Sequence, residues 1–269
     1  MALAPDWGLL LAPQAAMAAC AGAKSAGWLS DSEQHRLAGL RTAVRQSLFV
    51  ACRFALRQLL SEGEGEPGAW RLGSSADRAP WVEQGNPGAG CMNPAAVPLL
   101  SLSHSGGWIA CVKAPVSVGV DVEVQSASRV RDVQALSALV CAPAEQDWLL
   151  SQPVEIQQQC FLQLWCLKEA YFKCLGSGLD LEKIRRSAWR VRPARPDADC
   201  SRGIWQPTPA MAHARVWQAL TEEGEWMCVA LCALCPLPEL APSMVGAALQ
   251  WQSVTEWRLY AAAEGLEPH

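Results

Sequence analysis

The chain has 269 residues and a mass of 29.0 kDa, which is enough to bury a substantial hydrophobic core in one large domain or two small ones. Its 22 basic and 26 acidic residues nearly balance, so the composition does not indicate a nucleic-acid-binding surface. The 12 cysteines belong to a chain too long for a small disulfide scaffold, and many lie in apolar runs, which favours buried, reduced thiols in a cytoplasmic protein.

The N-terminal segment contains a first predicted strand at residues 9–12, within an apolar stretch that reaches Cys20. This stretch loosely resembles a lipoprotein signal, but it carries Asp6, lacks Lys and Arg near its start and is interrupted by Pro13. The sequence has no run of about 18 apolar residues that could span a membrane. We therefore expect a cytoplasmic protein without a membrane segment.

Residues 30–60 show helical periodicity. Ser30 and Glu33 have the spacing of a capping box, and Gly39 is a point at which the pattern can divide into two helices. For any one arginine of this region, a solvated helix face is the simpler interpretation. These arginines are Arg36, Arg41, Arg45, Arg53 and Arg57.

Residues 61–98 are rich in Gly, Pro, Ser and Glu, which indicates loops around one or two short strands. The segment that follows, residues 103–107, combines Ser103, His104 and two glycines ahead of an apolar strand at residues 108–112. Backbone N–H groups in such a turn can cradle a phosphate, and His104 can donate a hydrogen bond to it. The alternative for His104 is a structural histidine in a tight turn.

Residues 118–124 alternate strictly and are predicted to form a strand. Three valines face one way, while Asp121 and Glu123 face the other. Two neighbouring carboxylates on one face repel each other and give a strand no structural benefit. They form either a solvated face or a site for a hard cation such as Mg²⁺, which binds carboxylate oxygens and leaves room for phosphate and water.

Three helices are predicted further along the chain. Residues 133–140 are amphipathic, and Pro143 suits the first turn of the next helix, where the helix dipole alone explains Glu145. Pro153 opens a long helix that reaches Cys174 and ends at a Gly-Ser-Gly segment.

One face of this long helix carries Trp165, Glu169 and Lys173, which are spaced by four residues, while Lys168 points elsewhere. Such a Glu–Lys pair is usually a weak surface ion pair. The acidic strand changes this interpretation, because Glu169 would be a natural third oxygen ligand beside it.

The last third of the chain is less informative. It contains three predicted strands, at residues 187–191, 214–219 and 226–233. Residues 107–114 and 225–232 look alike, which suggests an internal duplication in which each half is a helix-on-sheet unit. We expect residues 241–269 to be a peripheral extension with at most a short helix.

Three motifs occur in order and at plausible spacing. They are S-H-S-G-x-W at residues 103–108, G-V-D-x-E at residues 119–123 and W-x-x-K-E-A-x-x-K at residues 165–173. Together they resemble the signature of the 4′-phosphopantetheinyl transferases, and the first resembles the larger, surfactin-synthetase-activating type. The resemblance is clear over residues 99–179.

The resemblance implies an α+β fold built as a pseudo-dimer of two similar helix-on-sheet halves, with coenzyme A at their junction. We assign residues 1–115 to a coenzyme A-binding half, 116–240 to a half with the metal and catalytic motifs, and 241–269 to the extension. The duplication favours a monomer. The implied reaction moves the 4′-phosphopantetheine arm of coenzyme A to a serine of an apo acyl or peptidyl carrier protein and releases adenosine 3′,5′-bisphosphate.

In this interpretation Asp121, Glu123 and Glu169 hold Mg²⁺, and Lys173 pairs with the pyrophosphate. The proton acceptor stays open between Glu169, a metal-bound water and Glu145. Lys168 is assigned to coenzyme A contact or local ion pairing, and Trp165 to packing under the site. The remaining expected coenzyme A-binding residues are Arg36, Arg45, Ser103 and His104.

Two alternatives come from other functional classes. A non-catalytic carrier-protein-binding module would keep the fold without the metal site. A different Mg²⁺-dependent phosphoryl-transfer enzyme could use the same carboxylates, although the sequence has no Gly-x-x-x-x-Gly-Lys loop. Where the family often has Gly-Lys-Pro, this chain has Gly-Asn-Pro, so Asn86 supplies no charge for a coenzyme A phosphate.

Overall fold

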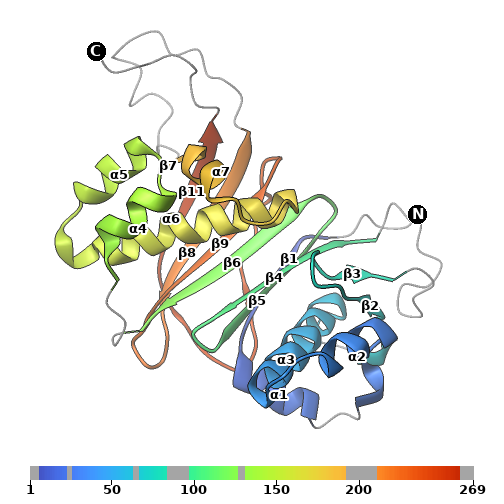
Figure 1. The fold of residues 1–269 in the computed structure, drawn as a ribbon. Coiled ribbons are helices and arrows are strands. Elements are labelled where there is room, and N and C mark those ends of the chain that lie inside the picture. The colour runs from blue at the N-terminus through green and yellow to red at the C-terminus, as the bar shows by residue number, and fades with distance from the viewer. Residues whose placement is uncertain are drawn as a thin grey trace.

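The computed structural model describes residues 6–22, 26–62, 67–83, 97–126, 131–191 and 211–260. In these ranges two larger β-sheets pack against each other, and each carries a long helix on its outer face (Figure 1). The fold is therefore mixed α+β, as the sequence predicts. No helix in the described ranges is long and apolar enough to cross a membrane.

The first sheet has the strand order β10-β1-β5-β4. Its strands are β1 (Gly8–Pro13), β4 (Leu99–Ser105), β5 (Trp108–Ala114) and β10 (Ser243–Met244). β5 pairs antiparallel with both β1 and β4. The first part of the chain also contains α1 (Gln14–Gly22), α2 (Asp31–Ala38), α3 (Ala43–Leu60), the short hairpin of β2 (Leu72–Gly73) and β3 (Trp81–Val82), and the 3-10 turns Ala26–Trp28 and Pro67–Ala69.

The second sheet has the strand order β6-β9-β8-β11-β7. Its strands are β6 (Val118–Gln125), β7 (Ala188–Val191), β8 (Ala212–Leu220), β9 (Trp226–Ala233) and β11 (Gln250–Tyr260). β9 pairs antiparallel with β6 and β8. The helices of this part are α4 (Val133–Val140), α5 (Pro143–Leu150), α6 (Val154–Leu175) and α7 (Leu181–Arg186).

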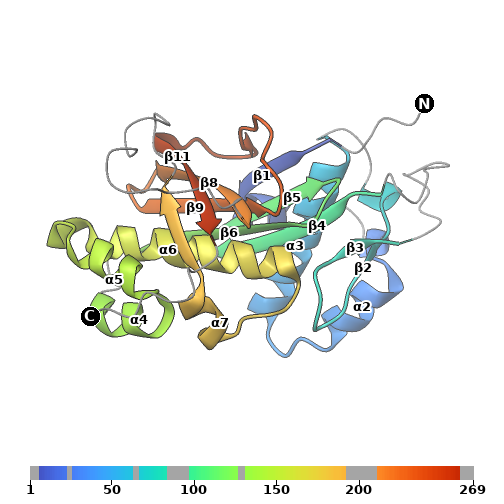
Figure 2. The same cartoon turned by 90° about the horizontal axis from the view of Figure 1, so that it is seen from above.

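Side chains alternate between the two faces along each strand, and both faces of each sheet are buried. In β5, Ile109 and Cys111 pack with α1 and α3, whereas Ala110 and Val112 face the second sheet. The valines of β6 join this core between the sheets, which leaves the other face of β6 against α6. Helix α6 lies along β6 of the second sheet and α3 lies against β5 of the first (Figure 2).

Helix boundaries follow the predicted capping signals. Ser30 and Glu33 form the predicted capping box, and Gly39 caps the end of α2. Gly176 ends α6 in the left-handed conformation, with a φ of 65°.

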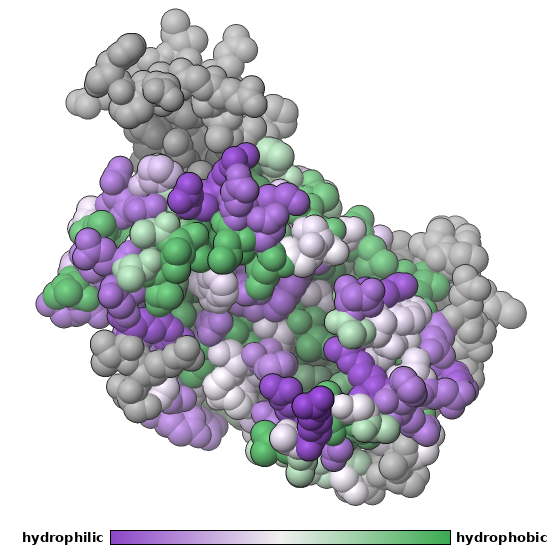
Figure 3. Space-filling view, in the orientation of Figure 1, coloured by the Kyte–Doolittle hydropathy of each residue, from purple (hydrophilic) through white to green (hydrophobic). Residues whose placement is uncertain are grey.

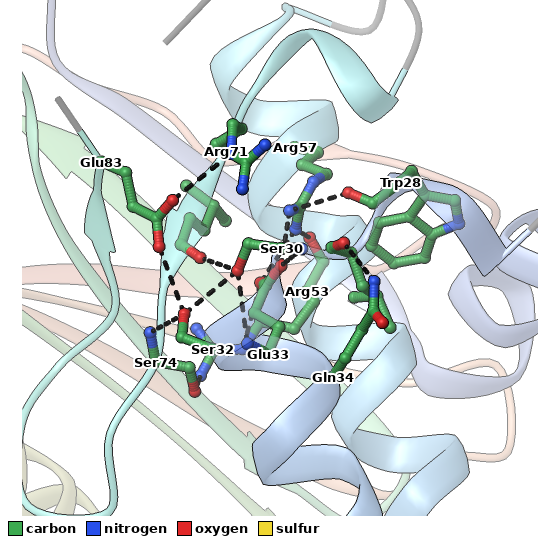
Figure 4. A network of polar contacts seen from close by, with 12 residues as sticks. Trp28, Ser30, Ser32, Glu33, Gln34, Arg53, Arg57, Arg71, Ser74 and Glu83 are labelled. Carbon is green, nitrogen blue, oxygen red and sulfur yellow. Dashed lines mark hydrogen bonds and ion pairs between the residues drawn. The ribbon is translucent and has the colours of Figure 1, made fainter. Parts of the chain in front are cut away.

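A buried ion-pair network fixes α2 on α3 (Figure 4). Arg57 donates to both carboxylate oxygens of Glu33, at 3.0 and 2.6 Å, and to the backbone oxygen of Trp28. Glu33 and Arg57 are fully buried, and Arg53 is 4% exposed. The solvated helix face expected for each arginine is therefore wrong for Arg53 and Arg57, because the inner face of α3 carries them into this network.

The C-terminal segment does not form a peripheral extension. Residues 243–244 add a strand to the first sheet, and β11 lies between β8 and β7 in the second. The reason is visible in the alternation of residues 250–260, which places Trp257 and Leu259 in the core beside α6. The short helix considered for this segment is likewise wrong.

Helix α6 lies unusually close to strand β6 at Gly119. A Cβ atom at this position would overlap the backbone oxygen of Ala170 and lie 2.5 Å from the backbone nitrogen of Cys174. Only glycine therefore permits this approach, which brings the exposed end of α6 beside the carboxylates of β6.

The outer helical layer leaves apolar side chains in solvent. Hydrophobic residues are visible among polar ones over the region of α4, α5 and the start of α6 (Figure 3). The exposed apolar residues of these helices are Leu139, Leu150, Val154 and Ile156.

Candidate active site

The site lies where edge strands of the two sheets meet. β4 and β6 belong to different sheets, and serine hydroxyls of β4 bridge them. Ser103 Oγ donates to Asp121 Oδ1 at 2.6 Å, and Ser105 Oγ donates to Glu123 Oε2 at 3.0 Å. Because side chains alternate along a strand, these serines share the face of β4 that is turned toward β6.

Lys173 connects helix α6 to this seam. Its Nζ lies 2.6 Å from Asp121 Oδ1 and donates to Ser103 Oγ at 2.9 Å. Glu169 lies one turn earlier on the same helix, and both side chains are half-buried. The helix face predicted from the spacing of four residues is thus turned toward the acidic strand.

Three carboxylates influence one another here. Burial raises the pKa of Glu169 to about 7, the Asp121 charge adds to the rise, and the Lys173 ammonium opposes it. Burial and the Asp121 charge also raise the pKa of Glu123, while hydrogen bonds from Ser105 and Trp165 lower it. Trp165 therefore supports a carboxylate of the site directly.

The three carboxylates would supply only some of the ligands of a magnesium ion. Asp121 is 3% exposed, and its Oδ2 has no hydrogen-bond partner, which is costly for a buried carboxylate oxygen. Within the described residues, no three acidic, histidine or cysteine side chains are close enough together to hold a metal ion by themselves. Mg²⁺ usually keeps several water and phosphate ligands, so an incomplete set with one free buried oxygen still suits it.

A pocket of about 620 Å³ extends from this acidic group to the helices of the first sheet. Its lining unites five residues that the sequence singled out: Arg36, Arg45, His104, Glu169 and Lys173. Arg53 and Arg78 also line it. No pattern in the sequence indicates Arg78. Arg53 resembles its solvated neighbours in sequence, and only the structure shows which face of α3 is buried.

His104 lies at the pocket as a neutral side chain. Desolvation and the Lys173 ammonium lower its pKa below the ordinary value of 6.5, although Asp121 opposes this. The ring is therefore uncharged near neutral pH, where one of its nitrogens can still donate a hydrogen bond.

The turn at residues 103–107, whose N–H groups are expected from the sequence to cradle a phosphate, has glycines that do not line the pocket. Gly106 and Gly107 have φ values of 53° and 79° and form the tight connection between β4 and β5. Gly106 packs so closely on Val124 that an added Cβ would lie 2.5 Å from the Val124 side chain. Ser103 is buried, and its hydroxyl is used by Asp121 and Lys173, so it positions the site and does not face a ligand.

Glu145 and Lys168 form a structural ion pair, which corrects two predictions. Lys168 Nζ lies 2.8 Å from Glu145 Oε2, and the two residues are 0% and 3% exposed. Lys168 also donates to backbone oxygens of Ile184 and Ser187, and Glu145 accepts from the backbone nitrogens of Ala142 and Trp189. Lys168 therefore cannot contact coenzyme A, and Glu145 cannot serve as a general base. Local ion pairing, the other interpretation of Lys168, holds. Asn86 lies outside the described residues.

Replacement of Glu145 by Gln should destabilise the protein strongly, because Lys168 would keep a buried charge without a carboxylate. We expect a loss of about 3–5 kcal/mol in the free energy of unfolding, measured by urea denaturation. Glu182→Gln removes an exposed partner of Arg186 on α7 and should leave stability unchanged. Equal stability of the two variants would contradict the structural role of Glu145.

Comparison with known proteins agrees with this geometry. Residues 117–230 match the family model described as the 4′-phosphopantetheinyl transferase superfamily. The chain is 38% identical to 4′-phosphopantetheinyl transferase psf-1 of Bacillus pumilus over 79 residues, which cover 29% of this chain and 32% of that protein. It is 28% identical to 4′-phosphopantetheinyl transferase HetI of Nostoc sp. over 204 residues, 68% of this chain and 82% of that protein.

A third relative, 4′-phosphopantetheinyl transferase gsp of Aneurinibacillus migulanus, is 30% identical over 80 residues, 29% of this chain and 32% of that protein. Apart from HetI, the chain thus spans about a third of the length of these relatives. The matched family region contains β6 and α6, the elements that carry the three carboxylates and Lys173. Over residues 117–230 the chain is thus similar to the 4′-phosphopantetheinyl transferase superfamily, and the relatives compared above are named as 4′-phosphopantetheinyl transferases.

Proposed function

We propose that this protein transfers the 4′-phosphopantetheine arm of coenzyme A to a serine of an apo acyl or peptidyl carrier protein. The serine oxygen forms a bond to the β-phosphorus of the pyrophosphate, the bond from that phosphorus to the bridging oxygen breaks, and adenosine 3′,5′-bisphosphate leaves. The observation that carries the proposal is that Glu169 and Lys173 of α6 line the same pocket as arginines of α2 and α3. It suits a ligand with phosphates at two separate places.

Electrostatic stabilisation is the main task of such a site, because phosphoryl transfer depends on positioning and on neutralising charge. Lys173 Nζ, which has three donors, can turn from Asp121 to a pyrophosphate oxygen. Asp121, Glu123 and Glu169 would hold Mg²⁺, which neutralises charge on the pyrophosphate when bound. The neutral ring of His104 would donate a hydrogen bond on the same side of the pocket.

We assign acceptance of the serine proton to Glu169. It lines the pocket, and its pKa of about 7 suits proton transfer near neutral pH. Because its carboxylate has two oxygens, Glu169 would be able to accept the proton as well as help to hold Mg²⁺. Glu145, the other candidate side chain, is buried in its pair with Lys168.

We further propose that residues 1–115 and 116–240 are two copies of one ancestral unit, with coenzyme A bound between them in a monomer. The strand orders β1-β5-β4 and β6-β9-β8 support this, since in each trio the strand that comes last in sequence lies between the other two. The long helix α3 or α6 follows the first strand in both. The chain from residue 241 onward adds strands to both sheets.

The proposed enzyme acts in the cytoplasm on a carrier protein and needs neither nucleic acid nor membrane. The ten cysteines that the structure describes are free thiols, as expected for a reducing compartment.

The direct test is mass spectrometry of an apo carrier protein after incubation with this protein, coenzyme A and Mg²⁺. We expect the carrier to gain one phosphopantetheine, and Asp121→Asn or a chelator to slow the reaction by at least roughly 100-fold. Asp147→Asn, at an exposed position of α5, is the matched control and should react normally. Coenzyme A binding without transfer to any of several unrelated carriers would favour a non-catalytic binding module instead.

Magnesium binding should depend on pH through Glu169. Because the pKa of this carboxyl is raised to about 7, it holds a proton at lower pH and must release it before it can bind a metal. Affinity should therefore rise as the pH increases from about 6 to about 8, by up to roughly tenfold per unit below the pKa. Isothermal titration with MgCl₂ measures this, and Glu169→Gln should flatten the dependence. Equal affinity for Mg²⁺ at about pH 6 and about pH 8 would refute the assignment of Glu169 as a metal ligand.

A further inference from the structure

Helix α6 and strand β9 share two pairs of cysteines that the proposed reaction does not use. Cys166 and Cys174 lie eight residues apart on α6, and Cys228 and Cys232 lie four residues apart on β9. Both spacings correspond to roughly 12–14 Å along their element. Because α6 packs against β6 and β9, each cysteine of the helix meets one cysteine of the strand (Figure 1).

Cys174 and Cys232 meet beside Gly119. Cys232 lies directly opposite Gly119 in the antiparallel register of β6 and β9, and a Cβ atom at Gly119 would lie 2.5 Å from the backbone nitrogen of Cys174. The glycine thus lets the end of α6 approach both strands closely. The Cys232 thiol donates a hydrogen bond to the Cys174 sulfur. The two sulfur atoms are therefore in contact across the interface between helix and sheet.

The surroundings of Cys174 favour its thiolate form. The hydrogen bond from Cys232 lowers the pKa of Cys174, burial opposes this, and the backbone N–H of Leu234 adds to the lowering. Burial raises the pKa of Cys232 well above its usual range, so Cys174 carries the charge of the pair. A thiolate is the nucleophilic form of cysteine, and a thiolate beside a second thiol is typical of redox-sensitive sites.

The place of Cys174 on the helix distinguishes this pair from the other one. Cys174 is 6% exposed and lies in the last turn of α6, and helix ends open more easily than helix interiors. Cys166 lies in the interior of the same helix, and both Cys166 and Cys228 are 0% exposed. We therefore expect a small oxidant to reach Cys174 but not Cys166.

We propose that Cys174 and Cys232 form a reversible disulfide in the presence of hydrogen peroxide, and that this disulfide weakens ligand binding at Lys173. The Cys174 thiolate attacks one peroxide oxygen, the O–O bond breaks, and the hydroxide that leaves becomes water with the proton that Cys174 has released. The Cys232 sulfur then bonds to the sulfur of the Cys174 sulfenic acid, whose hydroxyl leaves as water with the proton of Cys232. Two thiols are oxidised to one disulfide, and one peroxide is reduced to two waters.

The effect on the pocket follows from the position of Cys174 next to Lys173. A disulfide brings its two sulfur atoms to about 2.05 Å, closer than a hydrogen bond does, so the last turn of α6 must move relative to β9. The turn cannot move straight toward the sheet, because the backbone atoms of Ala170 and Cys174 already lie against Gly119. It must shift or rotate, which displaces Lys173 from its contact with Asp121 in the pocket wall. The link to coenzyme A rests on the proposed function.

Thiol mapping of the full-length protein tests the disulfide without coenzyme A. The reduced protein is treated with hydrogen peroxide at neutral pH, the remaining thiols are alkylated in denaturant, and unreduced peptides are analysed by mass spectrometry. We expect a link between Cys174 and Cys232 that dithiothreitol removes, while Cys166 and Cys228 stay alkylated. Oxidation confined to the exposed Cys20, or a link between other cysteines alone, overturns the proposal.

The affinity for coenzyme A, measured by isothermal titration, tests the consequence. Peroxide should weaken binding to the wild-type protein by roughly tenfold, the effect of losing a hydrogen bond to a charged group, and dithiothreitol should restore it. Cys174→Ser should be insensitive to peroxide, and Cys232→Ala provides the same test if that variant does not fold. Cys20→Ser removes an exposed thiol of α1 and should stay as sensitive as the wild type. Unchanged affinity of the cross-linked wild-type protein overturns the regulatory role.

The disulfide and the proposed function can fail separately. Reduced protein that does not bind coenzyme A contradicts the proposed function, while the mapped link between Cys174 and Cys232 stands. Reduced protein that binds coenzyme A and modifies a carrier protein, but forms no such link with peroxide, contradicts the disulfide alone.

Discussion

The contact of Lys173 with Asp121 is the interaction on which the site depends. One ammonium group on α6 touches a carboxylate on β6 and a hydroxyl on β4, at 2.6 and 2.9 Å, so it joins the helix to both sheets. It also lowers the repulsion among Asp121, Glu123 and Glu169, which would otherwise oppose their assembly. The close approach of α6 and β6 at Gly119 makes this contact possible.

The buried ion pairs differ in how many of their polar atoms have hydrogen-bond partners. Glu145 and Lys168 are enclosed, and each has further partners in the backbone, so the pair can hold α5 and α6 together but has nothing left for a ligand. Glu33 and Arg57 likewise join α2 to α3; Arg57 Nε has no hydrogen-bond partner, but Arg57 does not line the pocket. By contrast, Asp121 keeps one oxygen and Arg53 keeps two nitrogens without partners. Arg53 lines the pocket, and so does Lys173, the partner of Asp121.

Local patterns predicted much of the fold and the acidic half of the site. Strict alternation placed Asp121 and Glu123 on one face of a strand, and a spacing of four placed Glu169 and Lys173 on one face of a helix. These periodicities show which side chains share a face, but they do not show which element packs against that face. The spacing therefore places Lys168 on a different face from Lys173, but it does not reveal that Glu145 is the partner of Lys168.

The wrong predictions concern segments whose structure depends on packing or pairing with residues far away in the sequence. Residues 250–260 alternate like a strand, but their place between β7 and β8 depends on segments far away in the chain. Arg53 and Arg57 look like their exposed neighbours in sequence, and only the packing of α3 on the first sheet buries them. The expected coenzyme A-binding residues Arg36, Arg45 and His104 line one pocket, but the resemblance to a family could not identify Arg53 or Arg78 as part of its wall.

We propose that the pocket lined by α3 and α6 binds coenzyme A through Lys173. Isothermal titration of the purified protein with coenzyme A tests it most directly. We expect one coenzyme A molecule to bind per chain. Lys173→Met should lower the affinity for coenzyme A by roughly 10- to 100-fold, because a charged hydrogen bond is lost. No binding by the wild-type protein, or equal binding by Lys173→Met, would contradict it.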